Sequence, residues 1–275
     1  MKHERPQHKA DGKTRALIAL FVAGGLSVFF LDPIAQNPLW SQFADHRTLF
    51  GIPNAIDVLS NFPFLVIGAM GLRFIMNLSE KDQAFEFSIE RRAALCFFGG
   101  VFLTAFGSAW FHLDPGNDRL VWDRLPMTLA FSGVVCLLIA DRTDPRTGAS
   151  LLPPLALLGI FSVIWWRWSE SQGQGDLRLY FYIQFAPMLM IPILLTLFPA
   201  RYTKSSGYLW LLIWYALAKY CEVMDASIYD SSSNGISGHS LKHLLAACGV
   251  LHVLHMLRTR SALKIEPNKN NLLSL

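Results

Sequence analysis

Long apolar runs separated by short polar stretches dominate the chain. Eight such runs occupy about residues 15–31, 54–76, 92–112, 123–140, 151–168, 179–198, 207–225 and 238–257. Most are near the ~20 residues that a helix needs to cross ~30 Å of hydrocarbon. The runs lack the period-two alternation of a transmembrane strand. The pattern predicts an all-α, polytopic transmembrane helix bundle.

The composition supports this fold class and narrows the function classes. Of the 275 residues, 52% are hydrophobic and only 16% are charged, which is typical of a membrane protein. The net charge is +4 and no basic stripe alternates with aromatic residues, so nucleic acid is not an expected partner. No protein partner is predicted. The four cysteines lack CxxC spacing, which argues against a disulfide framework or a thiolate metal site.

The first run follows a basic stretch and is compatible with either a signal peptide or a retained helix. No small-residue cleavage site follows clearly, because the run ends in LDPIAQNPLW. We therefore expect residues 1–14 to form a basic cytoplasmic tail and residues 15–31 to form a retained, extra N-terminal helix.

The distribution of basic residues predicts the orientation. With the N-terminus in the cytoplasm, 17 of the 24 Lys and Arg residues fall on that side. The positive-inside rule then places both termini, including a tail at 258–275, in the cytoplasm. The end of the third run and the starts of the fourth and eighth runs share the outer face, periplasmic or luminal. We expect a bacterial inner membrane, with an endomembrane as the alternative.

Three histidines predict a metal site at this outer face. His239 and His243 are one helical turn apart and can chelate one ion, although such a pair also occurs as ordinary polar interface residues. His112 ends the third run, in the stretch GSAWFHLDPGNDRLVWD, and supplies a third ligand from another helix. Three neutral imidazoles leave one position of a tetrahedral zinc site for water, which is the pattern of a catalytic site.

Two further residues of the same stretch are candidate catalytic groups. Ser108 lies one turn before His112, where its hydroxyl can approach the water or a developing oxyanion. The alternative is a bond back to the carbonyl group of residue 104. Asp123 opens the fourth run and can act as a general base or as a helix cap.

The seventh run carries a polar group close to the outer face. Lys219 and Glu222 are spaced for an ion pair. Asp225 can orient a ligand histidine through its second ring nitrogen. His252 and His255 lie more than two turns beyond the histidine pair, so we do not expect them to bind the same metal.

These residues carry a resemblance to a known family. The matching segments are SAWFH (108–112), WDRLP (122–126) and HSLKH (239–243), in that order. They resemble motifs of the alkaline ceramidase superfamily of membrane hydrolases, which also includes adiponectin-receptor-like and Per1-type proteins. ADHRTLFGIPNAIDVLSNFPF (44–64) is similar to the ceramidase N-terminal region. The likeness covers roughly residues 44–257, a seven-helix catalytic domain, and makes the first helix an addition.

The resemblance implies roles for individual residues. His112, His239 and His243 are the implied zinc ligands, with Ser108 and Asp123 as catalytic partners, and Asp225 matches an aspartate of the family's penultimate helix. Animal ceramidases also hold calcium near the N-terminal segment. The candidate ligands for calcium are Asp45, Asn54 and Asp57, although Arg47 falls among them. Lys242 stands where animal ceramidases are aromatic, which implies a changed headgroup preference.

The expected function is zinc-dependent hydrolysis of a ceramide-type lipid amide to a sphingoid base and a fatty acid. A serine nucleophile is a weaker enzymatic alternative, because it needs a base free of metal. A receptor or membrane scaffold with a structural zinc site belongs to a second class. A transporter belongs to a third class, but the chain shows no inverted repeats that favour it.

Overall fold

The computed structural model describes residues 12–79 and 82–263, so most of the two expected tails lies outside the described residues. The α-helices are α1 (Gly12–Ser27), α2 (Ala55–Leu59), α3 (Phe62–Met76), α4 (Arg91–Leu113), α5 (Asn117–Arg142), α6 (Pro145–Ser171), α7 (Arg178–Leu197), α8 (Ser206–Val223), α9 (Asp225–Ser231) and α10 (Gly238–Thr259). Three short 3-10 helices are η1 (Val28–Phe30), η2 (Pro38–Ser41) and η3 (Ser88–Glu90). The described ranges contain no strand, only two isolated β-bridges.

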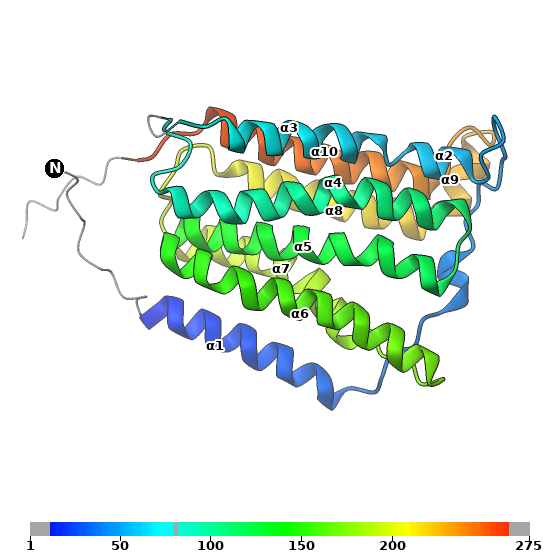
Figure 1. Cartoon of the computed structure of the whole chain (residues 1–275), viewed down its shortest axis with the longest axis horizontal. Helices are drawn as coiled ribbons and strands as arrows, with labels where there is room; N and C mark the ends of the chain where they lie inside the picture. Colours follow the sequence, from blue (N-terminus) through cyan, green and yellow to red (C-terminus); the bar gives the residue numbers. More distant parts are fainter. Residues whose placement is uncertain (1–11, 80–81, 264–275) are drawn as a thin grey trace, which may run out of the picture.

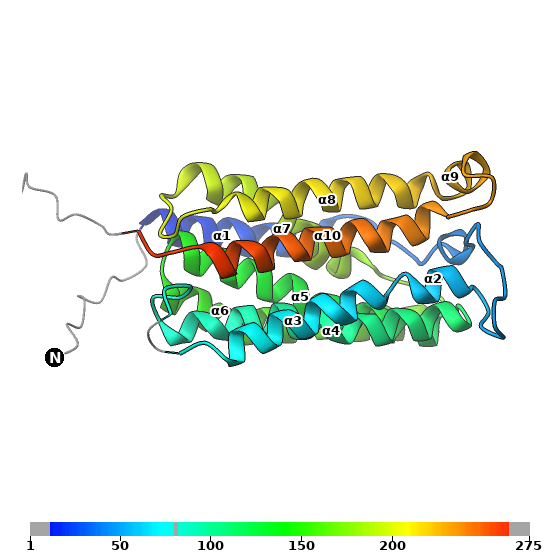
Figure 2. The same ribbon diagram turned by 90° about the horizontal axis from the view of Figure 1, so that it is seen from above.

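The long helices run side by side along one axis and form a bundle (Figures 1 and 2). The short helices α2 and α9 lie at one end, which we call the α9 end. The described chain begins in α1 and finishes after α10 at the opposite end (Figure 1). An even number of long helices separates these two points, so both lie on the same side of the bundle.

In the described part of the chain, seven stretches are long and apolar enough to cross a membrane, and together they make this a multi-pass membrane protein. They are Gly12–Phe30, Ala55–Met76, Ser88–Leu113, Asn117–Arg142, Pro145–Ser171, Arg178–Leu197 and Gly238–Thr259. Each corresponds to a run marked in the sequence. The remaining run, the seventh, forms α8, which packs along α10 but also carries Lys219 and Glu222. The predicted all-α polytopic fold is confirmed.

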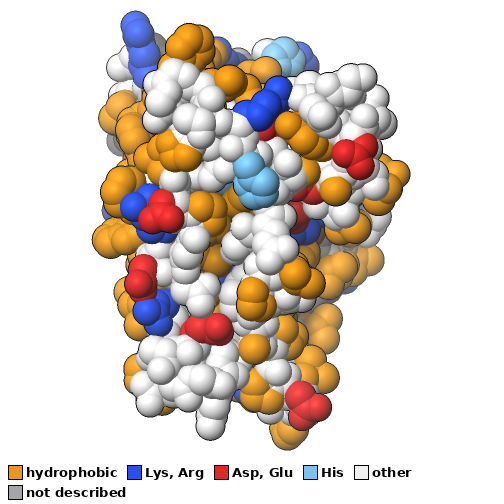
Figure 3. All heavy atoms as spheres, turned by 90° about the vertical axis from the view of Figure 1, so that its right-hand side faces the viewer, with side chains coloured by type: hydrophobic (Ala, Val, Ile, Leu, Met, Phe, Trp, Pro, Cys, Tyr) orange, Lys and Arg blue, Asp and Glu red, His pale blue; other side chains and the backbone are white. Residues whose placement is uncertain are grey.

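Large apolar side chains cover the sides of the bundle. Leu157, Leu189 and Val223 are each more than 60% exposed. Such exposure is costly in water and favourable in lipid. Charged side chains of both signs are instead scattered among apolar ones over the end face at α9 (Figure 3).

Two helix boundaries differ from the sequence expectation. The fourth run was expected to begin at Asp123, but α5 begins at Asn117, so Asp123 lies inside the helix and does not cap it. The first turns of α5 are polar, and an apolar pattern cannot mark them. The seventh run was expected to continue to residue 225, but α8 ends at Val223 and Asp225 is the first residue of α9.

Two glycines allow the close helix contacts that build the α9 end. A side chain at Gly107 in α4 would overlap the carbonyl oxygen of Trp122 in α5. A side chain at Gly238, the first residue of α10, would overlap the carbonyl oxygen of Cys221 in α8. Small residues of this kind let membrane helices meet backbone to backbone. They set α4 against α5, and α10 against α8, at the level of the histidines.

Helix α1 lies at the edge of the bundle. Only Thr14 and Leu17 are buried within it. Its main partner is α7, whose Tyr182 ring lies 5.1 Å from the Phe21 ring and whose hydroxyl donates to the Phe21 carbonyl oxygen. The α9-end site is therefore built without α1.

Candidate metal centre

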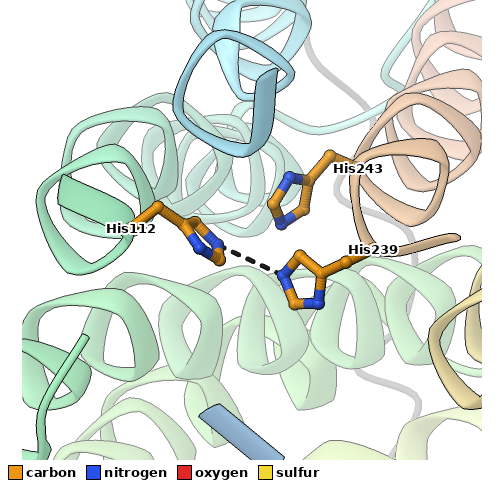
Figure 4. Close-up of side chains that lie close together, drawn as sticks. All are labelled: His112, His239 and His243. Carbon is orange, nitrogen blue, oxygen red and sulfur yellow. Dashed lines mark hydrogen bonds between the residues drawn. The ribbon is translucent and has the colours of Figure 1, made fainter. Parts of the chain in front are cut away.

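Three histidine rings converge at the α9 end (Figure 4). His112 lies in the last turn of α4, while His239 and His243 lie at the start of α10. A potential ligand atom from each lies within 4.8 Å of the others. The Nε2 atoms of His112 and His239 are 3.2 Å apart. The exposed fractions of the three residues are 1%, 6% and 5%, so the cluster is buried.

The donor set fits a metal ion. Two nitrogen ligands at ~2.05 Å from a tetrahedral zinc ion are about 3.3 Å apart, close to the spacing of the His112 and His239 atoms. The Nδ1 atom of His112 is buried without a hydrogen-bond partner. Buried polar atoms are normally paired, so this nitrogen remains available to a ligand. These three histidines could hold a metal ion.

A serine fixes the ring of His243. The Ser60 hydroxyl donates its single proton to the Asp57 carbonyl oxygen at 2.8 Å, and its oxygen lies 2.7 Å from Nδ1 of His243. With the hydroxyl proton on the Asp57 carbonyl oxygen, the proton of the second contact comes from the histidine. Nδ1 of His243 is therefore the protonated nitrogen, and its Nε2 carries the free lone pair, as a ligand requires.

An asparagine fixes the end of α4. Asn54 precedes α2 in the left-handed conformation, with φ of 47°, which asparagine tolerates better than most residues. Its side-chain amide donates to the carbonyl oxygen of His112 at 2.8 Å. The last turn of α4, where carbonyl groups lack helical partners, is thus tied to the start of α2.

Asp225 supports His239 by a different contact from the one that the sequence predicts. The expected partner is a ring nitrogen. In the structure, Oδ1 of Asp225 accepts from the backbone amide of His239 at 2.7 Å, and Oδ2 accepts from the backbone amide of Ala44 at 2.9 Å. The carboxylate therefore fixes the start of α10 through its backbone.

Asp57 completes the support of α10. Its Oδ1 accepts from the hydroxyls of Ser237, at 3.1 Å, and Ser240. Ser237 is the N-cap of α10 and accepts from the Ser240 amide at 3.0 Å. A carboxylate at this position also suits the positive end of the helix dipole. Asp57 is fully buried, so it belongs to the interior of the site.

The three candidate calcium ligands each have another role here. Arg47 donates to both oxygens of Asp45 at 2.8 and 2.5 Å. Burial raises the pKa of the Asp45 carboxyl, but the hydrogen bonds from Arg47 outweigh it and hold that pKa below its usual range. Asn54 faces His112 and Asp57 faces α10. Among residues 12–79 and 82–263, the histidine cluster is the one group of three or more His, Cys, Asp or Glu with metal-binding spacing.

Ser108 and Asp123 face each other across the contact between α4 and α5. Ser108 is 2% exposed and lies one turn before His112. Its hydroxyl donates toward the Asp123 carboxylate. Asp123 lies at the close contact of α5 with Gly107, the residue before Ser108. The structure thus brings both predicted catalytic residues beside the cluster.

A lysine from α10 enters the same group. Nζ of Lys242 lies 3.0 Å from Nε2 of His239 and 2.9 Å from Oε1 of Glu222. Glu222 also pairs with Lys219, as the sequence spacing predicts. Two ammonium groups and one carboxylate therefore bridge α8 and α10 next to the histidines.

The remaining predicted polar residues lie elsewhere. His252 lies outside the cluster, further along α10. Its ring stacks on that of Trp210 in α8, with 5.5 Å between the ring centroids. Asp114 and Asp118, which flank the short loop between α4 and α5, are exposed and pair with Arg119 and Arg167.

An apolar cavity lies directly beneath the histidines, on the side away from α9. It encloses about 120 Å³. Its lining includes Thr104, Met127 and Ala246, which are each about one turn from Ser108, Asp123 and His243 along their helices, as well as Phe64. The Phe64 ring also lies 6.1 Å from the His243 ring. The cavity is therefore continuous with the walls of the candidate centre.

Sequence reasoning left Ser60, Phe43 and the contacts of Lys242 without a role. Ser60 lies in a two-residue break between α2 and α3, and nothing in its own spacing signals a partner 183 residues away. Phe43 precedes α2 in an irregular loop. Lys242 directly precedes His243, so the sequence indicates that it lies near the cluster. The sequence does not indicate the direction of its side chain.

Comparisons with known proteins add no relative. The chain matches no protein-family model and no curated protein sequence.

Proposed function

We propose that the chain is a zinc-dependent intramembrane amide hydrolase of the alkaline ceramidase type. The observation that carries the proposal is the buried cluster of His112, His239 and His243 with Ser108 and Asp123 beside it. Residues from α4, α5 and α10, far apart in sequence, meet in one layer of the bundle. The catalytic domain comprises residues 44–257.

The donor set favours zinc as the metal. Three neutral imidazoles suit zinc, whereas magnesium and calcium prefer oxygen ligands. When bound, zinc supplies a Lewis acid that polarises a carbonyl group and acidifies water. His112, His239 and His243 are the residues that would hold it, and Ser60 supplies the contact that keeps His243 in the binding tautomer.

The side chains of this protein account for the proton transfers. Asp123 takes a proton from the attacking water, whose oxygen bonds to the amide carbon. Ser108 donates a hydrogen bond either to Asp123 or to the oxyanion that develops. The C–N bond then breaks as Asp123 returns the proton to the leaving nitrogen. The products are a fatty acid and an amine, and no other reactant is needed.

The apolar cavity supports a lipid substrate. Its lining is almost wholly hydrocarbon and begins about one helical turn from Ser108, Asp123 and His243. An acyl chain that passes from the bilayer into this cavity stays in apolar surroundings, so its hydrocarbon is not exposed to water on binding. Ceramide fits this arrangement, because its amide carbonyl lies at the head of two hydrocarbon chains. Cleavage would yield a sphingoid base and a fatty acid.

The proposed orientation follows from charge. Arg73, Arg91, Arg142, Arg146 and Arg258 lie at helix ends opposite α9. By the positive-inside rule this end faces the cytoplasm, with both termini, and the site opens near the outer face. A bacterial inner membrane is the proposed location.

The deciding experiment measures hydrolysis and metal content together. Purified protein is incubated with ceramide labelled in its acyl chain, with and without a zinc chelator. We expect labelled fatty acid to be released, zinc to be present in stoichiometric amount, and the chelator to stop the reaction. Activity that survives zinc depletion favours a serine nucleophile instead.

A receptor or scaffold with a structural zinc site is the second candidate. It is favoured by the depth of the cluster, since no histidine in it exceeds 6% exposure and the ligands join α4 to α10. Zinc in the protein, without any release of fatty acid from lipid amides, would support this function over hydrolysis.

A further inference from the structure

Phe43 packs directly on two of the three histidine rings. Its ring centroid lies 4.3 Å from that of His239 and 4.7 Å from that of His112. Phe111 meets it edge-on at 5.9 Å. Phe43 is only 4% exposed, although it belongs to an irregular loop. One aromatic side chain thus contacts a histidine from each of the two helices that form the cluster.

The loop behind Phe43 is attached to the other side of the site. The backbone amide of Ala44 donates to Oδ2 of Asp225, whose Oδ1 accepts from the His239 amide. The same carboxylate therefore holds the loop and the first turn of α10. Moving Phe43 away from the histidines together with this loop requires the loss of a hydrogen bond to a charged group, which is stronger than one between neutral groups.

Arg47 makes the second attachment. It pairs with Asp45, donates to the carbonyl oxygen of Gly235 at 2.9 Å, and lies 5.5 Å from the ring centre of Tyr229. Residues 43–47, which we call the cover segment, are therefore joined to α9 and to the loop that leads into α10. The segment forms part of the closed end of the bundle.

The cover segment and the apolar cavity lie on opposite sides of the histidines. The cavity residues Thr104 and Ala246 continue α4 and α10 away from the α9 end. Phe43 and Asp225 belong to the α9 end itself, where charged side chains mark the face toward water (Figure 3). A ligand reaching the histidines from the water at this end has to pass Phe43.

We propose that Phe43 is a positioning residue that holds the His112 and His239 rings and closes the aqueous route to them, with Asp225 as its anchor. The inference rests on the proposed zinc centre. It follows that the centre exchanges its ion slowly with the water at the α9 end, and that lipid reaches it through the apolar side.

The test is the rate at which zinc leaves the purified, zinc-loaded protein for a coloured chelator. We expect Phe43→Ala to release zinc at least about tenfold faster than the unchanged protein, in line with the usual effect of removing support from metal ligands. Phe43→Leu keeps apolar bulk and should restore slow release. Phe50→Ala is the matched control, because Phe50 lies in the same loop but is 98% exposed.

Asp225→Asn provides an independent arm that leaves the core volume unchanged. The substitution replaces one of the two oxygens that accept from the backbone amides of Ala44 and His239. We therefore expect faster zinc release from this variant as well. This arm decides the matter if Phe43→Ala fails to fold. Release at the unchanged rate from folded Phe43→Ala and Asp225→Asn proteins overturns the inference. Failure of the unchanged protein to bind zinc instead overturns the proposed function.

Discussion

The ammonium group of Lys242 lies 3.0 Å from Nε2 of His239 and 2.9 Å from the carboxylate of Glu222. It therefore contacts the same nitrogen that lies 3.2 Å from His112. An ammonium group and a metal ion compete for one lone pair and repel each other. Glu222 offers the ammonium group a second partner on the adjacent helix.

Replacement of this charge should strengthen metal binding. We expect Lys242→Met to bind zinc about tenfold more tightly, because removing a unit charge this close to a divalent ion is worth on the order of 1 kcal/mol or more. Competition with a calibrated chelator measures the affinity. Lys13→Met is the control, since Lys13 is exposed at the opposite end. Weaker zinc binding by Lys242→Met would show that the ammonium group does not compete with the metal ion for His239.

Loss of one histidine should empty the centre. We expect His243→Ala to lose both stoichiometric zinc and hydrolysis, because two imidazoles rarely suffice for a zinc site. Metal analysis of the purified protein and the labelled-ceramide assay provide the two readouts. His252→Ala, on the same helix but stacked on Trp210, should keep both. If His243→Ala retained zinc and activity, the ligand assignment would be wrong.

Removal of the Ser60 hydroxyl should weaken the centre without emptying it. In Ser60→Ala, Nδ1 of His243 loses its acceptor and the ring loses its fixed tautomer. Contacts of this kind are typically worth about 10- to 100-fold in metal affinity. Ser171→Ala removes an exposed hydroxyl at the same end and serves as the control. Equal affinities for the two variants would show that Ser60 does not orient the ring.

A side chain at Gly107 should separate α4 from α5. We expect Gly107→Ala to cost about 1–3 kcal/mol of stability, because its methyl group meets the Trp122 carbonyl oxygen. The displacement should also move Ser108 away from Asp123. Gly116→Ala is the matched control, since nothing lies within 4 Å of that position. Thermal unfolding of the two variants in the same detergent compares them, and equal midpoints would refute the contact.

The ion pair of the cover segment predicts a specific pH dependence. The pKa of Asp45 is held below its usual range, as burial, which raises it, is outweighed by the hydrogen bonds of Arg47. A lowered folded-state pKa gives stability that is present above the unfolded value of about 3.9 and is lost as pH falls through the folded value. Unfolding midpoints of the unchanged protein and Asp45→Asn should therefore differ at pH 6 and converge below about pH 4. A difference that persists in acid would contradict this account.

The sequence predicts the helices well, because a helix that crosses lipid needs a long apolar run, and such runs are visible in the sequence. It also predicts the meeting of His112 with His239 and His243, since counting the crossings places all three at one face. The predicted start of α5 was wrong because four of the seven residues from Asn117 to Asp123 are polar or charged, which hides this part of the helix from an apolar pattern. Polar residues do not show where such a helix begins.

Other contacts of the site depend on the direction in which single side chains point, which the spacing of residue types along the chain does not show. Lys242 turns to Glu222 and His239 because α8 and α10 meet closely at Gly238. Phe43 reaches the histidines because the loop before α2 folds back, with its amide on Asp225. These contacts join residues in loops or on different helices, and they depend on packing rather than on the spacing of residue types.

The two halves of the histidine cluster are 127 residues apart, and the second half lies on the last long helix. During synthesis His112 enters the membrane while five long helices still have to be made. His239 and His243 arrive with the final one, together with the Asp57 and Asp225 contacts that depend on α10. Acquisition of a metal ion at the proposed centre would therefore be a late event in biogenesis, which follows insertion of the whole bundle and marks its completion.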